Sequence, residues 1–182
     1  EDGWYDAVFE LSGHPENGAY RARVSNWLAG NTPEGQAARE KEQLDAINDR
    51  CREHGIPRPV TFSWPGNAFH TNALPVLQTA GIRFARRGGE PEVPYKLGGG
   101  VAYEPGADHP LLIPTAGDAR PDWTLQNLKR TAAMARDGRI AVLQFHGVPD
   151  GEHPWVNTPR ERFEEYMAWL HAGGYKVIAL RD

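Results

Sequence analysis

The sequence has little cysteine and no long apolar run, and these two absences exclude several classes of protein. Cys51 is the one cysteine among 182 residues, so the chain has neither a disulfide framework nor a cysteine metal cluster. Its position matches the core spacing of a predicted helix, which favours a packed thiol. No stretch approaches the roughly 18 consecutive apolar residues that a membrane span needs. We therefore expect no membrane span.

Positive charge is also in short supply. The chain has 20 Lys and Arg against 24 Asp and Glu, which gives a formal net charge of -4. This charge and a pI of about 6.0 do not indicate a surface that binds nucleic acid or an anionic membrane. The sequence opens with Glu-Asp-Gly and shows no methionine or signal-like segment there. We expect an amino-terminally incomplete chain, and its compartment, cytoplasmic or secreted, stays open.

Apolar residues alternate between helical and strand-like spacing along the chain. Strands are predicted at 60–64, 82–86, 111–113, 139–145 and 176–180. Helices are predicted at 37–54, around 74–77, at 124–137 and at 159–171. The region between residues 88 and 110 is rich in Gly and Pro and reads as a loop. Strands that alternate with helices imply a parallel sheet, either open or rolled into a barrel.

A parallel sheet brings the carboxyl ends of its strands to one edge, where the chemistry of α/β proteins collects. The residues that follow the predicted strands include 64–67, 86–87, 115–123 and 146–147. Among them, His146 ends the apolar run AVLQF, and a polar residue at the end of a buried strand is a poor way to build a core. His146 is therefore the leading candidate for a functional side chain.

Asp118 and Asp122 lie in the loop TAGDARPDW and would provide carboxylates for His146. A histidine beside a carboxylate is the smallest general acid or base pair, because the carboxylate fixes the imidazole tautomer. Tryptophans on the same edge would offer flat faces to sugar rings. Alternatives stay open: His146 as a hydrogen-bonded strand end, Asp122 as a helix N-cap, and the arginines at 86–87 as either anion-binding or solvated.

Three segments of the sequence resemble motifs of the polysaccharide deacetylases, the NodB-homology hydrolases of carbohydrate esterase family four. VLQFHG (142–147) resembles the last motif, and DARPDW (118–123) resembles the one before it. VTFSWPGNAF (60–69), followed by ALPVLQTAGIRFAR (73–86), resembles the middle motif and its sequel. The likeness covers about residues 55–182, and the last segments match one bacterial branch of the family closely.

The resemblance implies a fold. Members have a distorted (β/α) barrel with fewer than eight strands, so we expect one such α/β domain over 1–182, without its first one or two strands. A barrel that lacks its first strands exposes backbone hydrogen-bonding groups at an edge. We therefore expect lower stability or a homodimer formed at that edge.

The resemblance also implies roles for site residues. His146 would be the acid that protonates the departing amine, and Asp118 or Asp122 would orient it. Leu143 and Trp123 would line the pocket for the acetyl methyl group. Backbone amides around the middle motif would hold the developing oxyanion, so we expect substrate contacts there from Trp64, Pro65, Gly66 and Asn67. The arginine that often stands two residues before this proline is replaced by Ser63.

Family members hold a divalent metal, usually zinc, with one Asp and two His, and an Asp acts as base on the metal-bound water. This sequence shows neither amino-terminal motif whole. In one alignment, FELSGH makes His14 the first metal histidine, although Gly18 stands where its partner should be. In the other, Asp2 is a metal ligand and Glu1 takes the position of the base. His70, His109 and His153 are weaker substitutes than these residues.

The resemblance implies a metal-dependent hydrolase of carbon–nitrogen bonds that deacetylates N-acetylated sugars or polysaccharide. The alternative is a catalytically inactive carbohydrate-binding relative that lacks the metal site. Both hypotheses make a carbohydrate, or another N-acylated small molecule, the partner. They differ in turnover and in bound metal.

Overall fold

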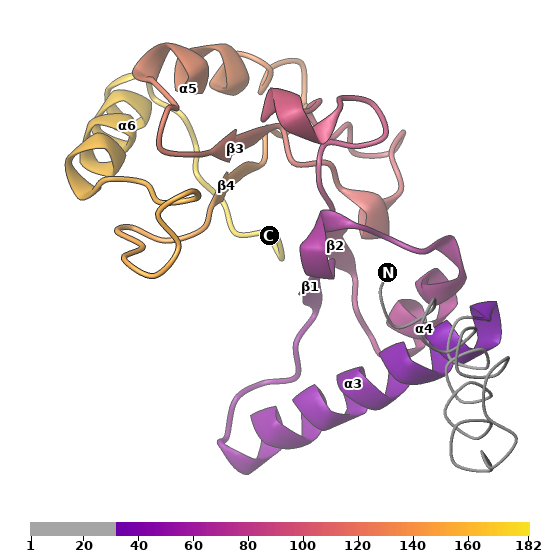
Figure 1. Cartoon of the computed structure of the whole chain (residues 1–182). Helices are drawn as coiled ribbons and strands as arrows, with labels where there is room; N and C mark the ends of the chain where they lie inside the picture. The colour runs from indigo at the N-terminus through magenta and orange to yellow at the C-terminus, as the bar shows by residue number, and fades with distance from the viewer. Residues whose placement is uncertain (1–31) are drawn as a thin grey trace, which may run out of the picture. The chain divides into compact units, whose positions relative to one another are not determined.

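The computed structural model describes residues 32–182, and the chain divides into two compact units (Figure 1). Unit 1 contains residues up to Arg58 together with His70–Ala80, and unit 2 contains Pro59–Phe69 and Gly81–Asp182. The prediction of one domain over 1–182 stays a prediction. His14 and Asp2 lie outside the described residues.

Unit 1 is built on the long helix α3, which runs from Pro33 to Glu53. It begins at Thr32, whose side-chain oxygen accepts a hydrogen bond from the Gly35 amide at 3.1 Å, as an N-cap does. The short turn η2 (Thr71–Ala73) and helix α4 (Leu74–Thr79) contact α3. Leu44, Ala73 and Leu77 are buried in this unit. The predicted helices at 37–54 and around 74–77 are confirmed.

Unit 2 contains two pairs of short parallel strands. β1 (Thr61–Ser63) pairs with β2 (Phe84–Arg86), and β3 (Gly117–Ala119) pairs with β4 (Leu143–Phe145). Ile113 forms a parallel bridge with Arg86, four residues before β3 begins. The segment 113–119 therefore runs beside β2 at its start and beside β4 at its end, so all these strands point the same way.

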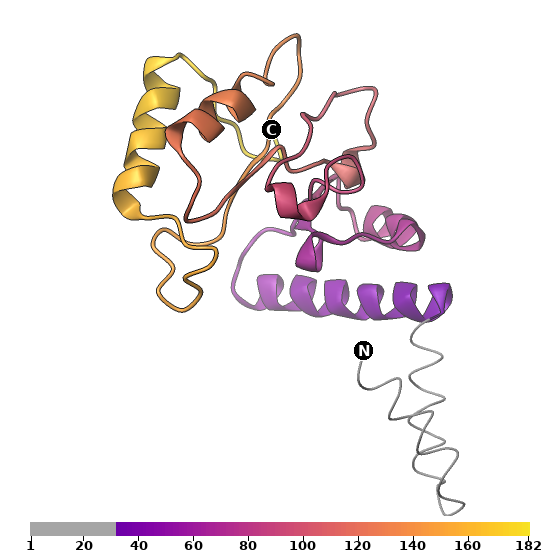
Figure 2. The ribbon, with the colours of Figure 1, turned by 45° about the horizontal axis from the view of Figure 1, so that its top comes forward.

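Two helices complete unit 2 beside the β3–β4 pair. α5 (Leu125–Ala132) and α6 (Arg160–Ala172) contact each other and lie side by side in Figure 2. The side chain of Thr124 begins α5 through a capping box with Asn127. Their apolar faces form one buried cluster, against which Leu143 and Phe145 pack: Ala119, Trp123, Leu128, Ala132, Tyr166 and Leu170.

The loop that follows β2 lies directly against the 113–119 segment. The Gly100 amide donates to the Ala116 carbonyl at 3.0 Å. A Cβ atom on Gly100 would lie 1.9 Å from the Thr115 carbonyl oxygen, so only glycine fits this close approach. The turn η3 (Tyr95–Leu97) lies just before this point in the chain.

Two predictions of secondary structure are wrong, and one strand is not predicted. Residues 111–113 are not a strand: Pro110–Leu112 is a 3-10 turn, η4, whose start is capped by the His109 ring. Residues 176–180 form no strand, and Val177 is 75% exposed, so no neighbour covers it. The sequence Gly-Asp-Ala of β3 lacks the apolar residues that signal a strand, and that strand was missed.

The described residues form a mixed structure of helices and short parallel strands. The strands predicted at 60–64, 82–86 and 139–145 are confirmed, each shorter than expected, and helix α5 ends at Ala132 rather than at 137. The distorted barrel stays a prediction, since residues 32–182 show two strand pairs and no closed ring. None of the helices in this range combines the length and apolar character needed to cross a bilayer.

Replacing Leu128 with alanine is expected to lower the free energy of unfolding by about 2–5 kcal/mol, because a fully buried side chain would leave a cavity between α5 and α6. Denaturant unfolding followed by circular dichroism measures the change. Gln126→Ala, one exposed position on the same helix, should shift it by less than about 0.5 kcal/mol. Equal effects of the two substitutions would contradict the packing of α5.

Candidate functional site

The side chains of β4 alternate, so its apolar residues and its polar residues lie on opposite faces of the strand. Side chains on a strand point to opposite faces in turn, so Leu143 and Phe145 share one face while Gln144 and the following His146 share the other. Leu143 and Phe145 pack against the apolar cluster of unit 2. Gln144 and His146 instead contact polar side chains from β3 and β2.

His146 and Asp118 form a pair at the carboxyl ends of β4 and β3. The Nε2 atom of His146 lies 2.9 Å from Oδ1 of Asp118. The other carboxylate oxygen, Oδ2, accepts a hydrogen bond from Nε of Arg120 at 3.0 Å. Asp118 is buried, whereas 27% of the His146 side-chain surface is exposed to solvent. A buried carboxylate with a partner on each oxygen holds the imidazole in place and leaves its other edge accessible.

Arg120 is held on both sides. Its guanidinium lies over the ring of Tyr95, 4.4 Å from the centroid, besides its ion pair with Asp118. Burial lowers the pKa of Arg120, but the hydrogen bond and the negative charge of Asp118 outweigh burial, so the net shift is upward. Arg120 therefore stays a cation that balances the charge of Asp118.

The Nε2 atom of His146 has a second close neighbour, Nε2 of Gln144 at 3.0 Å. The orientation of this amide is fixed because Gln144 Oε1 accepts a hydrogen bond from Nη1 of Arg86 at 2.7 Å. One ring nitrogen cannot donate to Asp118 and accept from Gln144 at once. A proton on Nε2 favours Asp118, because a carboxylate is the stronger acceptor. The Nδ1 atom of His146 forms no hydrogen bond with residues 32–182.

Arg86, at the end of β2, reaches the same group of residues. Besides Gln144, its Nη1 atom donates to Asn67 Oδ1 at 2.6 Å and to Thr115 Oγ1 at 3.1 Å. Its Nε atom lies 3.4 Å from Ser63 Oγ. Burial lowers the pKa of Arg86, and the negative charge of Asp118 only partly opposes that effect. All of these hydrogen-bond partners are neutral.

The neighbouring arginine has a different role. Arg87 is buried, and its guanidinium donates to the carbonyl oxygens of Leu112, Gly88 and Glu90. Its Nη2 atom also forms an ion pair with Glu92 at 2.6 Å. Arg87 therefore stabilises the loop after β2, and only Arg86 faces the histidine site.

The structure chooses between the two candidate carboxylates. Asp118 contacts His146, whereas Asp122 is exposed and forms no hydrogen bond or ion pair with the rest of residues 32–182. Asp122 is not a helix cap either, because the side chain of Thr124 begins α5. Within the described residues Asp122 has no place beside His146.

Two tryptophans expected to contact substrate belong to the core instead. Trp64 is 1% exposed, and its indole N–H donates to the Leu111 carbonyl at 2.9 Å. Trp123 is 7% exposed and packs edge-on against Tyr166. Their rings are packed in the core and offer no free face in the structure described, because large aromatic side chains stabilise a small core most when fully packed, and their contact with substrate stays a prediction. Leu143 likewise packs on the face opposite His146.

The turn η1 (Pro65–Asn67) lies directly after β1 and contacts the site through one side chain. Asn67 accepts the hydrogen bond from Arg86, as described above. The amides of Asn67 and Ala68 donate to carbonyl oxygens within the turn. These two amides are engaged within the turn, and the oxyanion contact around Pro65 and Gly66 stays a prediction.

The described residues do not assemble a metal site by themselves. Between residues 32 and 182, no three His, Cys, Asp or Glu side chains are grouped so that they could hold a metal ion. His109 caps η4 with its Nδ1 atom, and His153 pairs with Asp150 in the loop after β4. His70 is exposed at the start of η2. The preferred ligands, His14 and Asp2, lie outside this range.

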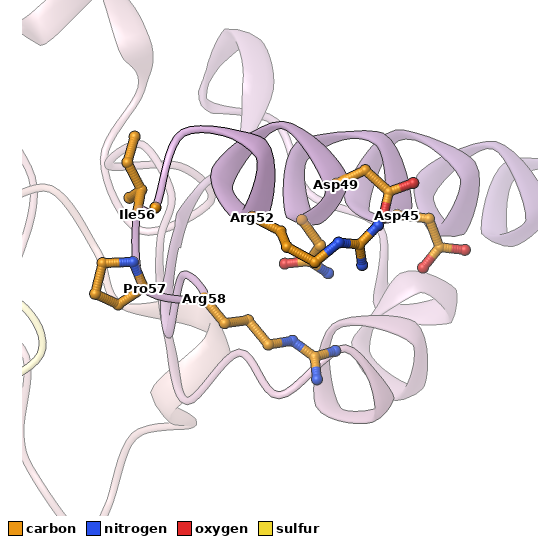
Figure 3. Close-up of a pocket in the computed structure, with 8 residues that line it drawn as sticks. Asp45, Asp49, Arg52, Ile56, Pro57 and Arg58 are labelled. Atoms are coloured by element: carbon orange, nitrogen blue, oxygen red, sulfur yellow. Dashed lines mark hydrogen bonds and ion pairs between the residues drawn. The ribbon is translucent and has the colours of Figure 1, made fainter.

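Unit 1 has a hollow at the carboxyl-terminal end of α3 (Figure 3). Figure 3 shows the Arg58 side chain extended back beneath Asp49 and Arg52, which form an ion pair at 2.8 Å. Its lining mixes acidic and basic side chains with Ile56 and Pro57. None of the residues around His146 lines this hollow, and we assign it no function.

No family model, curated protein or solved structure matches the chain. The assignment of function therefore depends on the sequence motifs and on the geometry around His146.

Sequence reasoning missed three residues of the site. Gln144 lies two positions before His146, and period-two alternation along a strand would have placed both on one face. Arg120 lies between the two candidate aspartates within a quoted motif, without an assigned role. The sequence presents Arg86 only as half of an arginine pair, because the contacts that distinguish it from Arg87 come from distant parts of the sequence.

Asp118→Asn is expected to shift the tautomer balance of the neutral His146 ring, because an amide replaces the carboxylate that accepts the Nε2 proton. Long-range ¹H–¹⁵N spectra of the imidazole nitrogens measure this balance. Asp122→Asn removes one charge from the same segment without touching the ring and should leave the His146 signals in place. Identical spectra for the Asp118 variant and the wild type would exclude the pair.

Proposed function

We propose that the protein is a hydrolase of carbon–nitrogen bonds that removes acetyl groups from N-acetylated sugars or polysaccharide. The pairing of His146 with Asp118 supports this proposal most strongly, at 2.9 Å and at the ends of two parallel strands. The same two residues occupy the positions at which the resemblance to polysaccharide deacetylases puts the catalytic acid and its orienting carboxylate. The distorted barrel of that family is the fold that goes with this proposal.

In this mechanism His146 delivers a proton to the departing amine. Asp118 accepts a hydrogen bond from Nε2–H and keeps the ring in one orientation, so the proton that is transferred is carried on Nδ1. As the C–N bond of the tetrahedral intermediate breaks, Nδ1–H gives its proton to the nitrogen, which leaves as a neutral amine. Arg120 balances the charge of Asp118 throughout, so the carboxylate remains available to stabilise the imidazolium.

The proposal includes a divalent metal, most simply zinc, with His14 as a ligand in the preferred alignment and Asp2 as a ligand in the other. A metal of this kind polarises the acetamide carbonyl and activates water. The described residues alone do not form such a site, and the acid step above is derived without it.

A carbohydrate substrate is favoured by the loop after β4. Trp155 is 66% exposed, whereas Trp64 and Trp123 are buried. The His153 ring supports it edge-on, with centroids 5.3 Å apart. The loop begins at His146 and is closed by a bridge between Gly147 and Asn157. An exposed indole on a closed loop offers the flat apolar face that sugar rings stack against.

Hydrolysis of an N-acetylated chito-oligosaccharide, measured as released acetate, tests the proposal. His146→Gln should lower kcat by about 10²–10⁴-fold, because it removes the acid. His171→Gln replaces an exposed histidine of α6, away from the residues around His146, and should leave kcat unchanged. Equal rates for the wild type and His146→Gln would overturn the assignment. Binding without turnover in the wild type would instead favour the inactive carbohydrate-binding relative.

Elemental analysis of the purified chain tests the metal. We expect about one divalent ion per chain, lost in His14→Ala, because a site of two or three ligands does not survive the loss of a histidine. His109→Ala is the matched control, since that ring caps a turn. Wild-type protein that stays free of metal after incubation with zinc would contradict a metal-dependent reaction.

A further inference from the structure

Arg86 is a half-buried cation that forms no direct ion pair among residues 32–182, and the charge of Asp118 acts on it only from beyond 4.0 Å. Ion pairs within 4.0 Å are present for Arg87 and Arg120, but none involves Arg86. Its partners are side-chain oxygens of Ser63, Asn67, Thr115 and Gln144, and none of these carries a charge. Partial burial of a charge is costly unless an opposite charge compensates it.

The hydrogen bonds of Arg86 occupy one side of its guanidinium. Nη1 contacts three oxygen acceptors at 2.6–3.1 Å, which fixes the plane of the group. Nη2 forms no hydrogen bond with the described residues, yet it is not a buried unpaired atom. Nε has only the long contact to Ser63, whose side chain is exposed. The three Nη1 contacts fix the direction of the edge formed by Nε and Nη2, and Nη2 donates to none of the described residues.

We infer that Arg86 is the binding residue for a carboxylate group, which its Nε–Nη2 edge holds through two parallel hydrogen bonds. Two N–H groups on one edge of a planar cation match the two oxygens of a carboxylate. Gln144 contacts both Arg86 and His146, so the bound group would lie next to the catalytic acid.

This inference rests on the proposed function for the source of the carboxylate. Hydrolysis of an acetamide yields acetate, which forms beside His146 and would be held there as product. An acidic sugar in the substrate would present the same group. The chemistry that Arg86 recognises is shared, so the experiment has to separate the two sources.

Titrations followed by ¹H–¹⁵N chemical shifts separate charge from shape. Acetate is compared with acetamide, a neutral molecule of the same size, and glucuronate is compared with glucose. We expect acetate to bind at least about tenfold more tightly than acetamide, because charge-assisted hydrogen bonds form only with the anion. Tighter binding of glucuronate than of acetate identifies a substrate carboxylate, and the reverse order identifies the product.

Variants assign the binding to Arg86. Arg86→Gln should weaken acetate binding at least about tenfold, whereas Arg83→Gln, an equal loss of charge at an exposed position just before β2, should leave it unchanged. Arg86→Lys keeps the charge without the paired donors and should weaken acetate binding by a smaller factor. It replaces Arg86→Gln in the test if that variant does not fold. Circular dichroism melts report folding.

A folded wild type that does not distinguish acetate from acetamide would overturn the inference, as would undiminished acetate binding in Arg86→Gln. These titrations need no turnover, so a negative result would count against the carboxylate site and not against the proposed function. An inactive protein that binds acetate through Arg86 would refute hydrolysis alone. An active enzyme indifferent to acetate would refute only the carboxylate site.

Discussion

The carboxylate of Asp118 is the constraint on which the site depends, because both of its oxygens are engaged while the residue is buried. A buried carboxylate that loses one partner becomes an uncompensated charge, which is strongly destabilising. His146 and Arg120 are therefore fixed by the same group, one from each side. Asp118 lies on β3 and His146 follows β4, so the register of these two strands is a requirement of the chemistry as well as of the sheet.

Short strands are sufficient for this arrangement. β2, β3 and β4 have three residues each, and every one of them sends a polar side chain, or the residue just after it, toward the group around Gln144. The opposite face of β4 packs against α5 and α6. Packing of one face of β4 thus fixes where its other face points. The polar side chains on that other face then lie within hydrogen-bonding distance of residues far away in the sequence.

Apolar periodicity explains which parts of the fold could be predicted. The helices and the strands at 60–64, 82–86 and 139–145 could be predicted, because burial of a face leaves a period in the sequence, whereas the apolar runs at 111–113 and 176–180 form no strand. β3 leaves no such period, since Gly117, Asp118 and Ala119 are small or charged. The choice between Asp118 and Asp122 depends on strand register, which is a property of two distant segments. The burial of the tryptophans could not be predicted for a related reason. Position at a strand end does not reveal whether an indole is covered by other residues, and the indole of Trp64 is covered.

The glycine contact between the loop after β2 and the 113–119 segment has a consequence for how this protein can vary. Gly100 lies so close to the Thr115 carbonyl that any side chain would push the two segments apart. The same loop carries Tyr95, which covers Arg120, the partner of Asp118. A change at a position with no side chain, and no contact with His146, would therefore reach the His146–Asp118 pair through successive neighbours, Tyr95 and Arg120.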